Sequence, residues 1–185
     1  MNSGIAIINV FKLVIVYALA AILGILAWTF TAHVAFVVVK RCSFGLHALN
    51  STVCTLVSCT MFVLIPWLVS SFGLGIGNLS VVVVFTGIIM ALALFAPADT
   101  KAKPLFGAKN RKRLKIKAVV SGVLVFAVAL LIPNETAKLL LTLGAVYQSV
   151  SILPVTYKML KRSENNYEQY ERTREATGVA GKSRC

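Results

Sequence analysis

Three cysteines and one histidine gather in one short segment of this 185-residue chain, KRCSFGLHALNSTVCTLVSC, residues 40–59. Such residues can bind a metal or act as a nucleophile with its base. The segment lacks the tight C-x2-C or H-x3-H pairs of structural zinc sites. We therefore expect no metal and no cofactor. A zinc protein is kept as an alternative, which would use Cys42, His47, Cys54 and Cys59.

His47 and Cys54 are seven residues apart. On one continuous helix they would lie about 10.5 Å apart, too far for a thiol–imidazole hydrogen bond. Asn50 is a good N-cap, however, and a helix is predicted to begin at Ser51. His47 would then lie in the preceding loop, where Gly45 permits a turn, and could fold back over the helix end.

Cys54 would then lie in the first turn of that helix. The helix dipole there favours a thiolate, and Lys40 and Arg41 add positive potential. This spacing can form a Cys–His dyad with an activated nucleophile. Asn50 and Gln148 are the residues that could orient the imidazole. We interpret Cys59 as a small buried hydrophobe, and His33 as a hydrogen-bonded interior histidine.

The composition indicates the setting of this dyad. Apolar residues make up 58% of the chain and charged residues 14%, against about 45–50% and 25% in soluble domains. These values exclude an ordinary soluble enzyme and predict an all-α, polytopic integral membrane helical bundle. The net charge of +13 is attributed to membrane topology, anionic lipid or an acidic partner, and no nucleic acid is expected.

The charge-poor stretches predict about six transmembrane or membrane-embedded helices within a single domain, residues 1–162. Residues 5–39 form either one long helix or two short ones that break near Gly24, and we favour two. A basic loop is expected at 97–117 and a flexible cytoplasmic tail at 163–185. The expected spans are about 5–23, 24–39, 48–72, 79–96, 118–132 and 137–157.

The basic residues form three groups: Lys40 with Arg41, the segment 101–117, and Lys158 with Lys161 and Arg162. Two spans separate each group from the next, so all three fall on one side of the membrane. By the positive-inside rule this side is cytoplasmic, which places Cys54 near the cytoplasmic face of the membrane.

Three blocks of sequence resemble the accessory gene regulator B (AgrB) family. The first contains Arg41, Gly45, His47 and Cys54; the second is APADTKAKPL, residues 96–105; the third is Ile152-Leu153-Pro154. They occur in family order across about residues 10–160. Any one block would be weak, whereas together they are specific.

The resemblance implies a multi-pass cysteine endopeptidase of quorum sensing in a bacterial cell membrane. It would remove the C-terminal tail of an AgrD-like propeptide, with Cys54 as nucleophile and His47 as general base. Attack by a substrate Cys or Ser on the resulting thioester would then give a cyclic thiolactone or lactone autoinducing peptide. Arg41, Gly45 and Asn50 would support the site.

Precursors in the family typically have an acidic C-terminal tail, which the basic segment could attract. The residues predicted to bind it are Lys101, Lys103, Lys109, Arg111, Lys112 and Arg113. Much of this charge is also explained by topology and lipid contacts. A homodimer is expected. The alternative function is a non-catalytic membrane peptide exporter or scaffold subunit, in which Lys12, His33 and Gln148 would line a path.

Overall fold

The structure of the chain, a computed structural model, describes residues 3–44, 51–98 and 108–159. Throughout this part of the chain the secondary structure is helical, apart from one isolated bridge between Phe44 and Ala98. The predicted all-α class is therefore confirmed for the described residues. The elements are α1 (Ser3–Ile22), α2 (Leu26–Ser43), α3 (Ser51–Cys59), the π-helix η1 (Thr60–Leu64), α4 (Ile65–Ser71), α5 (Asn78–Phe95), α6 (Ala108–Leu131), α7 (Glu135–Ser151) and α8 (Pro154–Met159).

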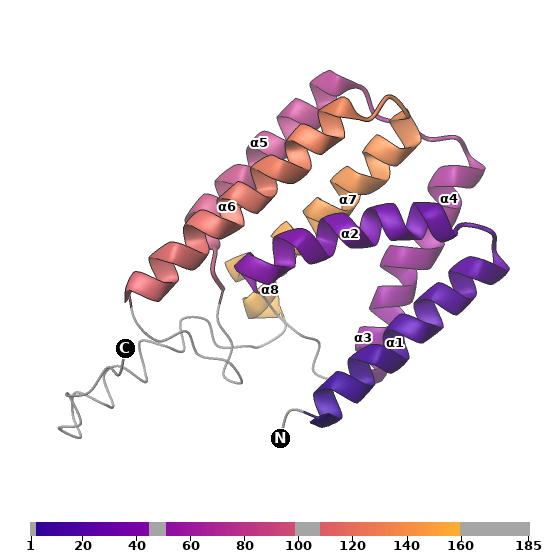
Figure 1. Ribbon diagram of the computed structural model, residues 1–185, viewed down its shortest axis with the longest axis horizontal. Coiled ribbons are helices and arrows are strands. Elements are labelled where there is room, and N and C mark those ends of the chain that lie inside the picture. Colours follow the sequence, from indigo (N-terminus) through magenta and orange to yellow (C-terminus); the bar gives the residue numbers. More distant parts are fainter. Residues whose placement is uncertain (1–2, 45–50, 99–107, 160–185) are drawn as a thin grey trace.

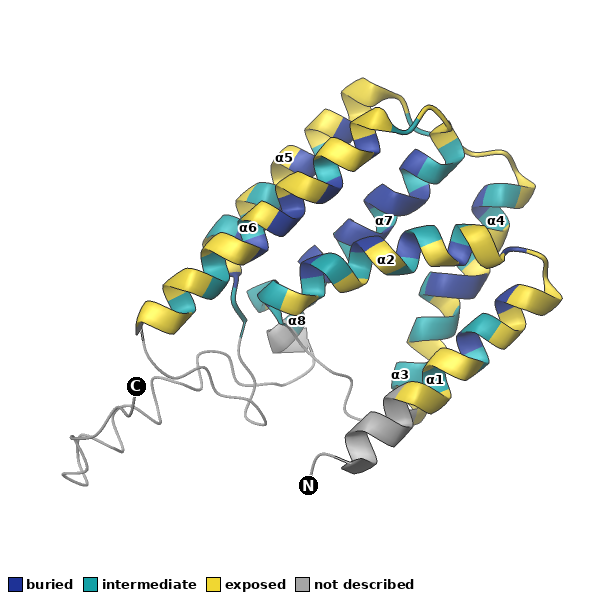
Figure 2. Cartoon of the chain, viewed as in Figure 1, coloured by how far each residue is buried: buried dark blue, intermediate teal, exposed yellow. Residues whose placement is uncertain are grey.

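Three helical segments are long and apolar enough to cross a membrane. They are Thr52–Ser71, which joins α3, η1 and α4, then Asn78–Phe95 and Lys109–Leu131. A shorter apolar helix covers Val10–Ile22. Large apolar side chains on the outward faces of these segments are exposed (Figure 2), as expected of surfaces that contact lipid.

The first apolar stretch forms two helices, α1 and α2. Gly24 lies in the left-handed region, with φ of 68°, and its N–H donates to the Ala21 carbonyl at 3.1 Å. The next N–H, from Ile25, donates to the Ala20 carbonyl at 2.9 Å. Glycine adopts this conformation without the steric cost of a Cβ, so it ends α1 and lets α2 start in a new direction.

Two predicted boundaries were wrong. The segment 97–117 is not a loop throughout, because α6 begins at Ala108 and includes the basic residues up to Lys117. Lys and Arg are good helix formers, and no Gly or Pro interrupts the chain between Ala108 and Ser121. The last apolar helix ends at Ser151, because Pro154 disfavours the helical conformation at Leu153, and α8 follows separately. The predicted tail, 163–185, lies outside the described residues.

Helices α2 and α7 pack together in the centre of the bundle (Figure 1). The pair α5 and α6 lies on one side of them, and α1, α3, η1 and α4 lie on the other. At Gly144, a Cβ atom would lie 2.1 Å from the backbone oxygen of Ala32 and 3.1 Å from the Cβ of Ala35. Small residues thus bring the α2 and α7 backbones into direct contact, as is common between membrane helices.

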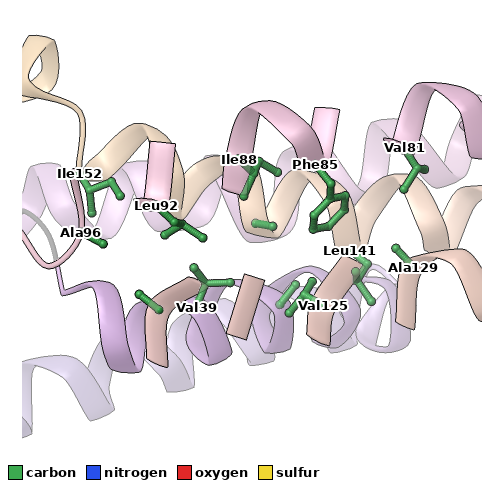
Figure 3. Packing of buried hydrophobic residues seen from close by; sticks show 13 residues of the cluster. Val39, Val81, Phe85, Ile88, Leu92, Ala96, Val125, Ala129, Leu141 and Ile152 are labelled. Atoms are coloured by element: carbon green, nitrogen blue, oxygen red, sulfur yellow. The ribbon is translucent and has the colours of Figure 1, made fainter. Parts of the chain in front are cut away.

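The buried residues form two clusters, one on each side of the α2–α7 pair. The α5–α6 cluster is built around Phe85, Ile88, Leu92 and Val125, which Figure 3 shows facing α2 and α7. The α1–α4 cluster contains buried apolar residues together with partly buried aromatic ones. Its members include Val16, Ala20, Phe62, Val63, Val69, Leu140, Tyr17, Trp28 and Tyr147.

The irregular turn in the α3–η1–α4 segment has a local cause. Pro66 has no N–H to donate to the carbonyl of Phe62, four residues earlier, so that carbonyl loses its helical partner. The fully buried Thr29 supplies the missing bond, since its hydroxyl donates to the Phe62 oxygen at 2.7 Å. A side chain of α2 therefore satisfies the backbone group that Pro66 frees within the membrane.

Candidate functional site

Cys54 lies at the start of α3. The described part of α3 starts at Ser51, so Cys54 is its fourth residue and lies in its first turn. Its thiol is free and partly buried, and its backbone oxygen accepts a hydrogen bond from the Ser58 hydroxyl at 2.8 Å. This is a position at which the helix dipole and unpaired N–H groups can stabilise a negative charge.

Lys40 of α2 contributes positive charge near Cys54. Lys40, in the last turn of α2, is half-buried, and its Nζ lies 4.7 Å from the centroid of the Phe36 ring. It is close enough to interact electrostatically with Cys54 and with Lys12 of α1. The neighbouring Arg41, predicted to support the site, is exposed. Lys40 thus places a cation of α2 within electrostatic range of the thiol.

Several predicted site residues lie outside the described part of the chain. They are His47, Gly45 and Asn50, between α2 and α3, and Lys101 and Lys103, between α5 and α6. The structure consequently brings Lys40 and Cys54 together, and the His47–Cys54 dyad stays a prediction.

The C-terminal end of α2 is held by two other helices. The N–H of Ala98, just after α5, donates to the carbonyl of Ser43 at 3.0 Å. From α7, the Gln148 amide donates to the Ser43 hydroxyl at 2.8 Å and to the Phe44 carbonyl at 2.5 Å. Figure 1 shows the ends of α2, α5 and α7 on the same side of the molecule as the start of α3.

Phe44 adopts an unusual backbone conformation at this junction. Its φ is 58° and its ψ is −124°, whereas few non-glycine residues have a positive φ. Such a conformation costs on the order of 1–3 kcal/mol and persists only where its surroundings hold it. The bonds from Gln148 and Ala98 provide that support at the residue where the chain turns from α2 toward the segment 45–50.

The basic residues of α6 extend from the same end of the bundle. Lys109, Lys112 and Arg113 are exposed on its first turns, and Arg111 is partly buried. Because this segment is helical, these residues lie along α6 rather than in an irregular loop. The helix gives an acidic ligand a row of exposed cations.

The described thiols are dispersed, and no three His, Cys, Asp or Glu side chains gather closely enough to hold a metal within residues 3–44, 51–98 and 108–159. His33 is engaged elsewhere, since its Nδ1 lies 3.0 Å from the Tyr17 hydroxyl. This contact confirms the prediction that His33 is a hydrogen-bonded interior residue.

Sequence reasoning missed two features of this region. Nothing in the sequence around Thr29 indicates its role. Pro66, however, lies four residues after Phe62 and lacks an N–H, which indicates that the Phe62 carbonyl needs another hydrogen-bond donor. The electrostatic interaction of Lys40 with Cys54 depends on how the helices pack, which the dipeptide Lys40-Arg41 does not reveal.

Comparisons with known proteins show which family the chain resembles. The family described as Accessory gene regulator B matches residues 4–152. An AgrB-like protein of Listeria innocua is 44% identical over 167 residues, covering 90% of this chain and 81% of the relative. One of Clostridium acetobutylicum is 42% identical over 166 residues, covering 90% and 78%.

A more distant relative is the accessory gene regulator protein B of Staphylococcus intermedius. It is 30% identical over 155 residues, which cover 84% of this chain and 80% of the relative. No solved structure matches the chain. The family match spans most of the helical bundle, and the identity to the Listeria relative extends over nine-tenths of the sequence. The chain therefore belongs to the AgrB family, a family of membrane peptidases with an accessory gene regulator role.

Proposed function

We propose that this protein is a membrane cysteine endopeptidase that removes the C-terminal tail of an AgrD-like propeptide and promotes its cyclisation. One observation carries the proposal: a free thiol, Cys54, lies in the first turn of α3 and interacts electrostatically with Lys40 of α2. A helix start and a nearby cation are the surroundings that activate catalytic cysteines.

In the proposed first step, the Cys54 sulfur attacks the peptide carbonyl that precedes the propeptide tail. His47 takes the thiol proton and returns it to the leaving amine as the C–N bond breaks. The product is a thioester between Cys54 and the N-terminal part of the precursor, together with the released tail.

In the second step, a Cys or Ser side chain of the precursor attacks the thioester. The bond to Cys54 breaks, the proton of the attacking group passes through His47 to the Cys54 sulfur, and a thiolactone or lactone ring is released. The thioester conserves acyl energy that hydrolysis would lose, so ring closure is an exchange between similar bonds. It requires the exclusion of water, which a site at the membrane edge favours.

We further infer a six-helix membrane topology, in which α1, α2, the α3–η1–α4 segment, α5, α6 and α7 each cross or enter the bilayer. Lys40, Arg41 and the basic turns of α6 would then face the cytoplasm. The opposite end carries fewer charges among the described residues: Glu135 lies beside Gly75, and buried Lys138 donates to the Asn78 side chain. An acidic precursor tail would be drawn to α6 on the cytoplasmic side.

Intact-mass analysis of the protein co-expressed with an AgrD-like propeptide tests the proposal. We expect a hydroxylamine-sensitive adduct that matches the N-terminal part of the precursor in mass. Cys54→Ser should abolish the thioester and the released tail, and His47→Ala should abolish both products. Cys59→Ser is the matched control, because Cys59 is also a free, partly buried thiol on α3.

If Cys54→Ser leaves processing intact, the peptidase proposal is wrong. A non-catalytic exporter or scaffold should tolerate the loss of one thiol, so that result would favour the alternative function. A zinc protein should instead lose function equally on substitution of Cys54, Cys42 or Cys59.

A further inference from the structure

Gln148 is the one side-chain amide in α7. Its side chain is fully buried, with an exposed fraction of 0%. The amide nitrogen donates to the Ser43 hydroxyl and to the Phe44 carbonyl, so one side chain of α7 binds two consecutive residues at the end of α2. Because Phe44 offers a carbonyl, the amide must present its nitrogen there, and its oxygen points elsewhere.

The amide oxygen, Gln148 Oε1, is buried and has no hydrogen-bond partner among the described residues. Buried polar atoms without partners are rare, and where they occur they often belong to functional arrangements. The amide also lies inside a membrane protein, where polar side chains are costly and tend to mark functional regions.

The bonds of Gln148 act where the chain leaves α2. Phe44 is the last described residue before the segment that carries His47, and it holds a backbone conformation that a phenylalanine rarely adopts. His47 follows three residues later, so the intervening chain spans at most about 10 Å. A small rotation at Phe44 would move the imidazole by ångströms, and a misplacement of about 1 Å can cost roughly 100-fold in rate.

We propose that Gln148 is a positioning residue of the peptidase reaction. By binding Ser43 and Phe44 it fixes the direction in which the chain leaves α2 toward His47, and thereby the alignment of the general base with Cys54. This inference rests on the proposed function. Gln148 does not touch the reacting atoms, so it acts through the chain between α2 and α3.

A purely structural role makes a different prediction. If Gln148 only joined α7 to α2, its loss would lower the amount and melting temperature of folded protein without changing the chemistry of the molecules that remain folded. The test therefore needs a readout of the dyad itself. The pH profile of Cys54 alkylation is suitable, because a neighbouring imidazole changes the pH range over which a thiol reacts.

The experiment uses the full chain in detergent with Cys42, Cys59 and Cys185 replaced by Ser. The rate of Cys54 alkylation by iodoacetamide is measured from pH 5 to 10 in this background and with Gln148→Met or His47→Ala added. Gln148→Met keeps the length of the side chain and removes its amide. Ser149→Ala is the matched control, since the hydroxyl of this neighbouring buried residue donates to the Ala145 carbonyl of its own helix.

We expect Gln148→Met to move the alkylation profile to that of His47→Ala. It should lower the kcat of precursor processing by roughly 10- to 100-fold with KM unchanged within about twofold. Ser149→Ala should keep the parent profile. If Gln148→Met does not fold, Gln148→Asn keeps an amide that is one methylene too short, and the same displacement of the profile is expected.

A Gln148→Met or Gln148→Asn profile identical to that of the parent, with kcat unchanged per folded molecule, would overturn the positioning role. The proposed function would survive that result. Conversely, processing that persists in Cys54→Ser would overturn the peptidase itself and the role of Gln148 with it. The two failures are thus distinguished by different variants.

Discussion

The two sides of the central α2–α7 pair are built differently. On the α5–α6 side the contacts are apolar and regular: Phe85 and Leu92 are fully buried, and the rings of Phe85 and Phe126 lie 5.2 Å apart between centroids. On the α1–α4 side a π-helix interrupts the segment, Thr29 donates to a backbone carbonyl, and the buried Tyr147 hydroxyl has no hydrogen-bond partner among the described residues.

The two sides also carry different candidate functional residues. Cys54 belongs to the irregular, more polar side, whereas the basic turns of α6 belong to the regular one. π-Helical turns are frequent at functional sites, and regular apolar packing gives a rigid support. The α2–α7 pair joins the two sides, and Gln148 lies at the end of that pair nearest to the candidate nucleophile.

The largest effect is expected from separating α2 and α7. Gly144→Leu should prevent most of the protein from reaching its folded state, because even a Cβ at this position meets the backbone oxygen of Ala32 at 2.1 Å. Overpacking usually costs about 1–3 kcal/mol, and a clash with backbone should exceed that range. Size-exclusion chromatography in detergent and near-UV circular dichroism measure the folded fraction.

Gly87→Ala on α5 is the control for that experiment. A Cβ there has no atom within 4 Å, so the substitution should leave the folded fraction unchanged or slightly raised. A normally folded Gly144→Leu protein would show that the two sides do not depend on a close α2–α7 contact.

The next largest effect is expected from a substitution on the α5–α6 side. Phe85→Ala removes a fully buried ring from the α5–α6 cluster and should lower the free energy of unfolding by about 3–5 kcal/mol. Thermal unfolding in detergent gives the stability. In molecules that remain folded, the alkylation rate of Cys54 should equal that of the parent, since the thiol lies across the α2–α7 pair. A changed alkylation rate would show that packing on the α5–α6 side affects Cys54.

A smaller effect is expected from the irregular side. Thr29→Val keeps the shape of the side chain but leaves the Phe62 carbonyl without a partner, so stability should fall by about 1–3 kcal/mol. Thr29→Ser retains the hydroxyl and should lose less. Equal stability of the Val variant and the parent protein would mean that another group satisfies the carbonyl.

The smallest effect on stability is expected from substitution of exposed charged residues. Replacing Lys109, Lys112 and Arg113 together by Gln should leave the melting temperature unchanged and raise the KM for an acidic-tailed precursor by roughly 10-fold. The difference from the parent should shrink in 1 M salt. A precursor with a neutral tail serves as the control, and an equal rise in its KM would rule out tail recognition by these residues.

Much of the fold was predictable from local sequence. The glycine break between α1 and α2 and the apolar stretch of α5 follow from properties of neighbouring residues. The density of charge in residues 108–117 suggests a loop, yet α6 extends through them because Lys and Arg favour helices. The apolar pattern continues to Tyr157, yet α7 ends at Ser151 because Pro154 disfavours the helical conformation at the preceding residue.

The sequence by itself determined that the chain is a helical membrane protein, which segments are apolar, and that His47 and Cys54 stand in a family pattern. Composition and spacing are properties of the chain alone. Only the tertiary structure decided that Lys40 comes within electrostatic range of the thiol, that Thr29 donates to the Phe62 carbonyl, and that Gln148 holds the end of α2. These pairings join residues far apart in the sequence, and they exist only because helix packing brings particular faces into contact.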